Sequence, residues 1–317
     1  MRIIHLQVGG SINSHMDASV SAIGFFDGLH AGHRQLIAKA MEIAKEKGLK
    51  SSLITFSPSP QSFLLKSEEH LLTTISERIK LAEEIGLDQI IILKFNKKLS
   101  QLSPDEFHEE IIQKMNIKHL VCGEDFRYGF KGAGSVESLK TDKRFSLSVI
   151  NDIKAEDNRI SSTLIKSALS EGDLVSVEKY LTKPYAIDGY VKHGRKLGRT
   201  IGFPTVNLSY SKTKILPRDG IYIGITTVRG KNYVSTINIG HNPTVNTVID
   251  KSVESFIHDF DEDIYNERVS FKFIKRIRDE LKFASVEELI SQMHKDIQAS
   301  EDFFDSKTRE GYEIETI

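Results

Sequence analysis

Residues 21–37, SAIGFFDGLHAGHRQLI, carry the pattern from which the fold of the first half of the chain is predicted. The stretch opens with SAIGFF, a short run of small, apolar and aromatic residues that is typical of a buried strand. A glycine-containing turn at 27–33 follows, and apolar residues then recur at helical spacing from Leu36 to Ile43. We predict a strand, a turn and a helix N-terminus, whose unpaired N–H groups and positive dipole end favour a phosphate.

Strand and helix patterns alternate along the rest of the first half. Further buried strands are predicted at Met1–Val8, Ser51–Phe56, Gln89–Leu93 and His119–Cys122. Helices are predicted from Arg34 to about Lys47 with Gly48 as the stop, over Ile75–Ile85, from Pro104 to about Met115, and within Ile160–Leu169. This alternation predicts right-handed βαβ units on a parallel sheet. Ligands bind beyond the carboxyl ends of such strands, which indicates the loops 27–33, 57–60 and 123–134.

The pattern changes near residues 182–185, where helical spacing gives way to shorter alternating runs. These runs are Ala186–Val191, Ile221–Val228, Tyr233–Ile239, Val253–Phe256 and Val269–Phe273. They predict an antiparallel barrel or sandwich, followed by an amphipathic helix over Ser285–Phe304. We therefore expect two domains, residues 1–182 and residues 183–317.

The composition is that of an ordinary globular protein, with 39% hydrophobic and 27% charged residues among 317. The net charge of −1 argues against a nucleic-acid or anionic-membrane surface. Because Cys122 is the only cysteine, an internal disulfide and a multi-cysteine zinc site are excluded. The first residues lack the apolar core of a signal peptide and no run approaches a membrane span, so a cytoplasmic protein is expected. The oligomeric state is left open.

His30 and His33 stand on either side of Gly32 at the predicted helix start, an arrangement that suits nucleotidyl transfer. In that reaction a phosphate attacks the α-phosphate of ATP, and its existing charge removes the need for a base. Two imidazoles can donate hydrogen bonds to phosphate oxygens, while Gly32 admits the nucleotide closely. A pair of capping or solvated histidines is the alternative interpretation. A zinc site is a weaker interpretation, because the two histidines lack an evident third ligand.

A second candidate site lies in residues 193–207, HGRKLGRTIGFPTVN, where three glycines alternate with basic residues. Such a loop can fold its backbone N–H groups around a polyphosphate. Thr205 and Asn207 add oxygen ligands of the kind that Mg²⁺ prefers. A basic glycine hairpin that binds RNA, or that only promotes solubility, is the alternative interpretation.

The tetrapeptide His30-Ala31-Gly32-His33 resembles the HxGH signature of nucleotidyltransferases. Together with GEDFRYG from Gly123 and ISSTLIK from Ile160, it resembles the FMN adenylyltransferase module of prokaryotic FAD synthetases over about residues 10–182. The resemblance implies an α/β, Rossmann-like nucleotidyltransferase domain in which His30, His33 and Lys166 are catalytic. The implied ATP-binding residues are Gly24, Phe25, Asp27, His30, Gly32, His33, Ser161, Ser162 and Thr163. The implied flavin-binding residues are Ser57, Pro58, Asp125, Phe126 and Arg127.

Pro204-Thr205-Val206-Asn207 resembles the PTxN motif of riboflavin kinases, and further matches, among them Pro243-Thr244, extend the resemblance over about residues 183–306. The resemblance implies an antiparallel six-stranded β-barrel with a terminal helix. Glu254 occupies the position of the catalytic base that a neutral 5′-hydroxyl requires, and Thr205 and Asn207 match the Mg²⁺ ligands. The implied ATP-binding residues are Gly194, Lys196, Gly198, Gly202, Pro204, Thr205 and Asn207. The implied flavin-binding residues are Glu254, Arg278 and Phe283.

Four positions depart from the patterns of these families. Lys166 stands where arginine is usual, and it lacks the planar fork that grips phosphate bidentately. Ser59 stands where histidine is usual, while Phe256 and His258 differ from many kinases around Glu254. These departures support an alternative in which one module is degenerate, leaving a monofunctional FMN adenylyltransferase or a riboflavin kinase alone. A catalytically inactive flavin-binding regulator is a further alternative, disfavoured because binding alone requires neither the histidine pair nor the carboxylate.

The leading expectation is a bifunctional transferase of FAD biosynthesis. Riboflavin and ATP give FMN and ADP at the second site, and FMN and ATP give FAD and pyrophosphate at the first. Both steps are expected to need Mg²⁺, because the charge of the polyphosphate must be neutralised. The expected partners are riboflavin, FMN and ATP, with no nucleic acid and no membrane.

Overall fold

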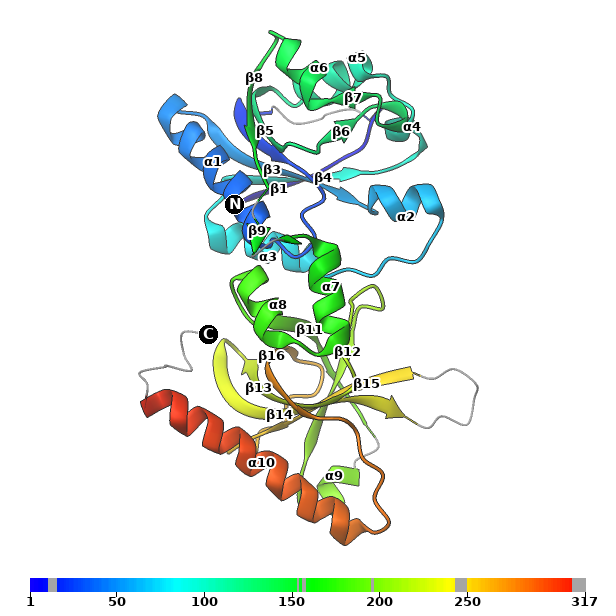
Figure 1. The fold of residues 1–317 in the computed structure, drawn as a ribbon, viewed down its shortest axis with the longest axis vertical. Coiled ribbons are helices and arrows are strands. Elements are labelled where there is room, and N and C mark those ends of the chain that lie inside the picture. Colours follow the sequence, from blue (N-terminus) through cyan, green and yellow to red (C-terminus); the bar gives the residue numbers. More distant parts are fainter. Residues whose placement is uncertain (11–15, 153, 156–157, 195–196, 243–249, 310–317) are drawn as a thin grey trace. The chain divides into compact units, whose positions relative to one another are not determined.

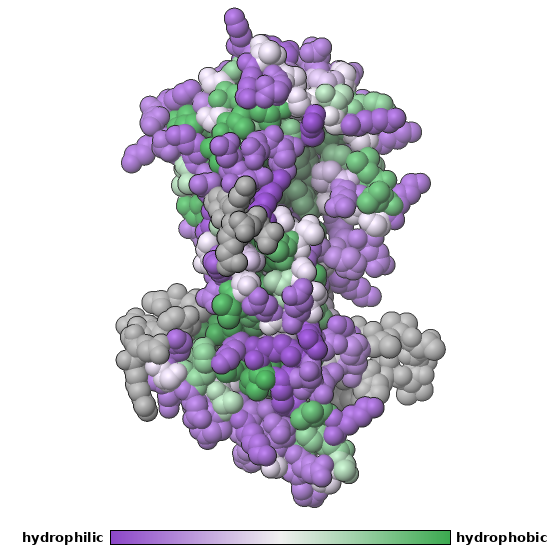
Figure 2. Space-filling view, viewed as in Figure 1, coloured by the Kyte–Doolittle hydropathy of each residue, from purple (hydrophilic) through white to green (hydrophobic). Residues whose placement is uncertain are grey.

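The computed structural model describes residues 1–10, 16–152, 154–155, 158–194, 197–242 and 250–309 (Figure 1). The chain divides into two compact units, Met1–Ser162 and Thr163–Ile317. The sequence-based division at residues 182 and 183 follows the change of pattern and remains a proposal. The face of the molecule in Figure 2 is mostly hydrophilic, with apolar residues in small groups.

The first unit is built on the predicted parallel sheet. In spatial order its strands are β1 (Arg2–Leu6), β4 (Gln89–Lys94), β3 (Lys50–Ser57), β2 (Ser19–Ile23), β5 (Ile117–Gly123) and β8 (Ser146–Ile150). All neighbouring pairs are parallel. The chain steps outward from β2 through β3 to β4 and then resumes at β5 on the other side of β2. The strand order therefore reverses between β2 and β5, and such a switch point opens a crevice at the carboxyl ends of the strands.

Helix α1 (Ala31–Lys47) follows β2 and confirms the predicted strand, turn and helix. Its buried face packs on the sheet through Ile37, Ala40, Ile43 and Ala44. The helix ends at Gly48, whose φ of 63° is the left-handed conformation that glycine adopts without strain. Helix α3 (Ile75–Ile85) also has its predicted bounds, because Thr74 and Glu77 form a capping box at its start.

Shorter elements complete the first unit. They are α2 (Pro60–Leu65), α4 (Lys97–Ser100), α5 (Pro104–Phe107), a π-helical segment (His108–Gln113), β6 (Arg127–Tyr128), a 3-10 turn (Phe130–Gly132), β7 (Gly134–Ser135), α6 (Val136–Thr141), β9 (Lys154–Ala155) and β10 (Asn158–Arg159). The single helix predicted from Pro104 to about Met115 is thus an α-helical turn that continues as a π-helical one.

The second unit contains a closed antiparallel barrel, which confirms the six-stranded barrel and the terminal helix. Around the barrel the strands are β11 (Tyr185–Lys192), β12 (Thr205–Tyr210), β15 (Asp250–Ile257), β14 (Lys231–Asn242), β13 (Gly220–Val228) and β16 (Arg268–Arg278). The helices are α7 (Ser162–Glu171), α8 (Leu174–Leu181), α9 (Leu197–Thr200) and α10 (Val286–Arg309). Strand β12 lies in the glycine-rich stretch, where the local pattern predicts no strand.

Helix α10 covers part of the outer face of the barrel (Figure 1). Phe304 on this helix is buried against Ile223 and Ile225 of β13 and Ile274 of β16. These isoleucines point outward, since inward positions such as Tyr222 alternate with them along the strand. The barrel therefore has a filled interior and a second, partly apolar layer between its wall and α10.

Candidate active sites

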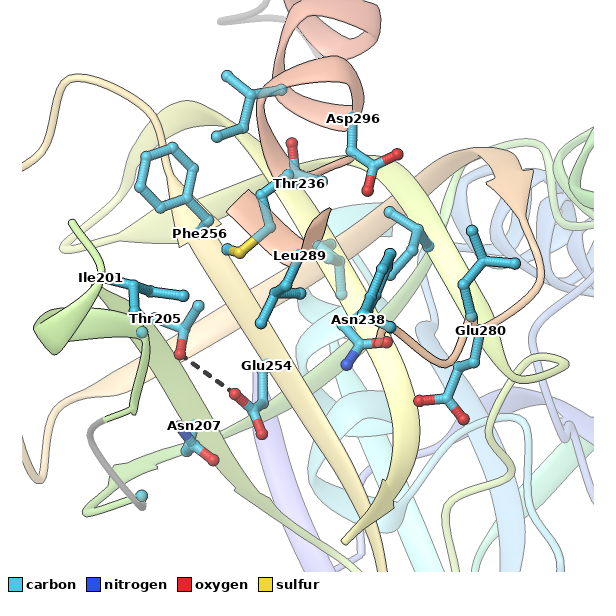
Figure 3. A pocket seen from close by; sticks show the side chains of 18 of the residues that line it. Ile201, Thr205, Asn207, Thr236, Asn238, Glu254, Phe256, Glu280, Leu289 and Asp296 are labelled. Atoms are coloured by element: carbon cyan, nitrogen blue, oxygen red, sulfur yellow. Dashed lines mark hydrogen bonds between the residues drawn. The ribbon is translucent and has the colours of Figure 1, made fainter. Parts of the chain in front are cut away.

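The larger of the two candidate sites is a cavity of about 590 Å³ in the second unit, between the barrel wall and α10. Its polar end is formed by outward-facing residues of β12, β14 and β15 (Figure 3). Its apolar end is formed by the segment before α10 and by α10 itself, with Leu281, Phe283, Leu289, Met293 and Ile297 among the lining residues. The shape and polarity suit a ligand with one polar and one apolar end.

Strand register brings the polar residues of this cavity into one row. Asn207 on β12 pairs with Glu254 on β15, and Glu254 pairs with Asn238 on β14. The row continues through Ile221 on β13 to Arg278 on β16. Neighbouring strands lie about 4.8 Å apart, so side chains in one row form a continuous wall. The register thus assembles residues from five separate strands.

Glu254 is held by a hydrogen bond within the cavity. Thr205 Oγ1 donates to Glu254 Oε2 over 3.1 Å, and Figure 3 shows the carboxylate between Thr205 and Asn207 on one side and Asn238 on the other. Arg278 lies farther along the row, where its guanidinium donates to Asp296 on α10 over 2.9 Å and 2.5 Å. The side chain of Asp296 is 5% exposed, and local sequence signals gave no indication of this partner.

The glycine-rich stretch is only partly described. Gly194 and Gly198 line the cavity, and a Cβ atom at Gly198 would collide with the carbonyl oxygen of Phe203. Pro204 lines a smaller neighbouring cavity that also includes Thr205. Gly202 lines neither of these two cavities and has a φ of 89° at the end of α9. The predicted ATP ligand Lys196 and the matched pair Pro243-Thr244 lie outside the described residues.

The two unusual residues near Glu254 have different surroundings. Phe256 lines the cavity, two positions from Glu254 on the same face of β15. The buried His258 lies beyond the cavity, where its Nε2 is 3.0 Å from Thr236 Oγ1. Thr236 Oγ1 is also 2.9 Å from Ser300 Oγ on α10, so His258 belongs to the polar seam between β14 and α10.

The second candidate site is a cavity of about 350 Å³ in the first unit, at the switch point between β2 and β5. The loops after β2, β5 and β8 and the segment before α7 form its walls. Of the residues proposed from the sequence, those that line it are Gly24, Phe25, His30, Gly32, His33, Asp125, Phe126, Arg127, Ser161 and Ser162. The carboxyl ends of β2 and β5 therefore bring together the HAGH motif at His30–His33 and the GEDFRYG motif that begins at Gly123, about ninety residues later in the chain.

His30 and His33 stack on each other at the N-terminus of α1, with ring centroids 3.6 Å apart. Burial lowers the pKa of His30 to about 4, against an opposing effect of Asp27. Burial also lowers the pKa of His33 well below its usual value, and His30 and Arg78 act in the same direction. Both rings are consequently neutral at pH 7, and each offers one N–H donor. The Nδ1 atoms of both rings are buried without a hydrogen-bond partner among the described residues.

The depressed pKa of His30 predicts a loss of stability in acid. The unfolded chain binds a proton near pH 6.5 and the folded chain only near pH 4, so stability falls as the pH drops through this interval. The loss attributable to His30 is about 3 kcal/mol. Urea unfolding of the full chain, followed by circular dichroism from pH 7 to pH 4, measures it. His30→Gln should show a shallower pH dependence than the wild type, and equal slopes would contradict the prediction.

The loop that carries the histidines is anchored by buried polar contacts. Asp27 lies beside the cavity without lining it, and its Oδ1 accepts from Thr73 N over 3.0 Å. Its backbone oxygen accepts from Ser162 Oγ over 2.8 Å. Arg78 on α3 is 1% exposed; it donates to the carbonyl oxygens of Phe25 (2.9 Å) and Thr73 (3.1 Å), and its guanidinium lies 4.4 Å from the Phe25 ring centroid.

Replacing Arg78 by methionine should destabilise the first unit by about 3 kcal/mol, because it leaves buried carbonyl oxygens without a donor. Lys80→Met is the matched control on the same helix, since Lys80 forms an exposed ion pair with Glu84. Urea unfolding of the full chain, followed by circular dichroism, measures the loss. Equal stability of the two variants would show that Arg78 does not anchor the loop.

Arg159 lines the cavity and was not among the residues proposed from the sequence. Its guanidinium contacts Asp125 Oδ2 at 2.7 Å and Asp152 Oδ2 at 2.9 Å. Burial raises the pKa of Asp152, and the positive charge of Arg159 acts in the opposite direction. Arg159 immediately precedes the ISST segment, so an arginine next to a matched motif was the signal available in the sequence.

Some proposed residues of this site lie outside the cavity wall. Ser57 and Pro58 do not line it, and Thr163 and Lys166 fall on α7 within the second unit, so their roles remain predictions. Ser59, where the family usually has histidine, serves as the N-cap of α2 and accepts a 3.0 Å hydrogen bond from Ser62 N. Serine is a preferred residue at such a position, which gives Ser59 a local structural role.

The described residues thus form two separate candidate active sites, one with a histidine pair on a parallel sheet and one with a carboxylate on a barrel. No helix among the described residues is long and apolar enough to cross a membrane. The family model described as FAD synthetase matches residues 12–164, and the one described as riboflavin kinase matches residues 181–304. The chain belongs to the family of bifunctional riboflavin kinase/FMN adenylyltransferases.

This assignment rests on related proteins whose sequences match nearly the whole chain. The bifunctional riboflavin kinase/FMN adenylyltransferase of Bacillus subtilis is 36% identical over 92% of this chain and 95% of its own length. The protein of the same description from Listeria monocytogenes is 36% identical over 90% of this chain and 92% of its own length. A crystal structure from Streptococcus pneumoniae, described as a macrolide-efflux protein, superposes with a TM-score of 0.85 at 29% identity, covering 94% of this chain and 99% of that one.

Proposed function

We propose that the two activities of the family are divided between the two cavities, with a module boundary at residues 182 and 183. Riboflavin is phosphorylated to FMN in the cavity of the barrel. FMN receives the adenylyl group of ATP in the cavity of the parallel sheet, giving FAD and pyrophosphate. The observation that carries this division is a difference in chemistry. Glu254 faces the barrel cavity, and no arginine or lysine among the described residues contacts its carboxylate. In the sheet cavity, by contrast, Asp125 and Asp152 pair with Arg159, and two neutral imidazoles line the wall.

Phosphorylation of riboflavin begins with a neutral 5′-hydroxyl, which needs a base. Glu254 takes the hydroxyl proton as the oxygen attacks the γ-phosphorus of ATP, and ADP leaves. The hydrogen bond from Thr205 holds the carboxylate in place. The apolar end of the cavity, with Phe283 and Leu281, receives the isoalloxazine ring, and Arg278 lies at the edge of that region.

Adenylylation of FMN starts from a nucleophile that is already an anion. The FMN phosphate attacks the α-phosphorus of ATP and pyrophosphate leaves, so the task of the site is to stabilise spread negative charge. His30 and His33 donate hydrogen bonds to phosphate oxygens at the N-terminus of α1, where the helix dipole adds a favourable field. Arg159, which also lines the cavity, supplies a positive charge.

Mg²⁺ is part of the proposal for both steps. In the barrel cavity, Thr205, Asn207 and Glu254 form an oxygen donor set of the kind that Mg²⁺ prefers, and the first two would hold the ion. When bound, the ion would neutralise charge on the ATP phosphates. Each of the two proposed steps consumes ATP, and the single cysteine, Cys122, suits a reducing compartment. For these reasons we also place the protein in the cytoplasm.

Incubating the purified chain with riboflavin and magnesium ATP tests the proposed function. With γ-labelled ATP, label is expected in FMN and in FAD, whereas α-labelled ATP is expected to label FAD only. Excess EDTA should stop both steps. Formation of FMN without FAD, or of FAD only from added FMN, would support a monofunctional enzyme. Absence of both products would overturn the proposal.

A further inference from the structure

We infer that Asn238 is a further substrate-binding residue of the kinase cavity, which recognises the secondary hydroxyl groups of the ribityl chain. The inference rests on the assignment of riboflavin phosphorylation to this cavity. Asn238 lies on β14, directly beside Glu254 in the cross-strand row, and its side chain lines the cavity (Figure 3).

The amide of Asn238 has an unmet hydrogen-bonding need. Its Oδ1 atom is buried and has no hydrogen-bond partner among the described residues. A buried polar atom without a partner is unfavourable, and such atoms are rare in folded proteins. The terminal torsion of asparagine is broad, so a small rotation can present either its acceptor or its donors to a ligand. A bound group that both donates and accepts would remove this cost.

The position of Asn238 selects the part of the substrate that it meets. In the row, Asn207 lies on one side of Glu254, the residue at which the 5′-hydroxyl reacts. Asn238 and then Ile221 lie on its other side, toward the apolar end. A strand spacing of about 4.8 Å separates each residue from the next. Asn238 therefore faces the segment between the reacting hydroxyl and the ring system. In riboflavin this segment is the polyol chain, and each of its hydroxyls both donates and accepts hydrogen bonds.

Sites that hydrogen-bond a substrate hydroxyl discriminate strongly against analogues that lack it, because a buried polar group is then left unpaired. The test compares riboflavin with a flavin that bears a 5-hydroxypentyl chain, which keeps the terminal hydroxyl and lacks the secondary ones. For the wild type we expect kcat/KM to be roughly 100-fold higher with riboflavin. Asn238→Leu should lower kcat/KM for riboflavin roughly 10- to 100-fold while changing the value for the analogue less than about 3-fold.

Matched variants separate recognition from general damage. Asn238→Ala removes the amide without adding an apolar branch and should lower the same selectivity ratio. Asn232→Leu makes the same substitution on β14 away from the cavity. Asn232 Oδ1 accepts hydrogen bonds from Thr227 and Lys272 there, and its replacement should leave the selectivity ratio unchanged. Urea unfolding of each variant, followed by circular dichroism, reports whether the barrel has folded.

An equal loss for both flavins in the Asn238 variants, or no loss for either, would overturn the inference. Failure of the cavity assignment itself is distinguishable from this, since Glu254→Gln would then phosphorylate riboflavin normally. A dead Glu254→Gln together with an unchanged selectivity ratio in Asn238→Leu would reject only the role of Asn238.

Discussion

Replacing Glu254 by glutamine is expected to lower the rate of riboflavin phosphorylation by about 10²- to 10⁴-fold, the usual contribution of a general base. Glutamine keeps the shape of the side chain and an oxygen able to accept the hydrogen bond from Thr205, but it cannot take a proton from the 5′-hydroxyl. Riboflavin binding should change little, because the apolar end of the cavity is untouched. Single-turnover phosphorylation and riboflavin fluorescence measure the two effects separately.

Two controls accompany this variant. Glu267→Gln removes a carboxylate that contacts Arg229 at the surface, and it should phosphorylate riboflavin at the wild-type rate. FMN adenylylation in Glu254→Gln should also be unchanged, since we propose that this reaction takes place in the other cavity. A Glu254→Gln enzyme that retains more than about a tenth of the wild-type rate would refute its role as the base.

Replacing either His30 or His33 by alanine is expected to lower FMN adenylylation by about 10²- to 10³-fold, the effect of removing one donor to transition-state charge. Because the two rings stack at 3.6 Å, loss of one also disturbs the other, and the double variant should lose less than the product of the single losses. Steady-state formation of FAD from added FMN measures the loss. Phosphorylation of riboflavin by the same variants should stay at the wild-type rate.

His5→Ala supplies the matched control for the histidine variants. His5 is exposed on the edge strand β1, outside the cavity, so its replacement should leave FAD formation unchanged. The adenylyl-transfer role would be refuted if His30→Ala and His33→Ala formed FAD as fast as His5→Ala.

The sequence predicts those parts of the fold in which local chemistry decides the structure. The bounds of α3 are set by a capping box and a terminal glycine, and both are visible in the sequence. The strand β12 escapes prediction because its first residues, Thr205 to Asn207, end a stretch whose three glycines suggest a loop. Its strand conformation comes from pairing with β11 and β15, which is a tertiary effect.

The same distinction applies to the sites. His30, His33 and Glu254 stand in short patterns whose chemistry is recognisable from residue types and spacing. Arg78 and Asp296 do not, because each acts through partners that are distant in the chain: Phe25 for Arg78 and Arg278 for Asp296. Asn238 becomes meaningful only through the register that sets it beside Glu254, and register across five strands is not encoded in any one of them.

The alternation along β15 has a consequence for how this protein tolerates variation. Val253 and Ser255 face the barrel interior and are buried, whereas Glu254 and Phe256 face the cavity. Random substitutions at these four positions should therefore sort into two kinds, with changes at 253 and 255 lowering the amount of folded protein and changes at 254 and 256 lowering turnover of protein that is still abundant. Selection for expression and selection for flavin synthesis would act on neighbouring codons almost independently.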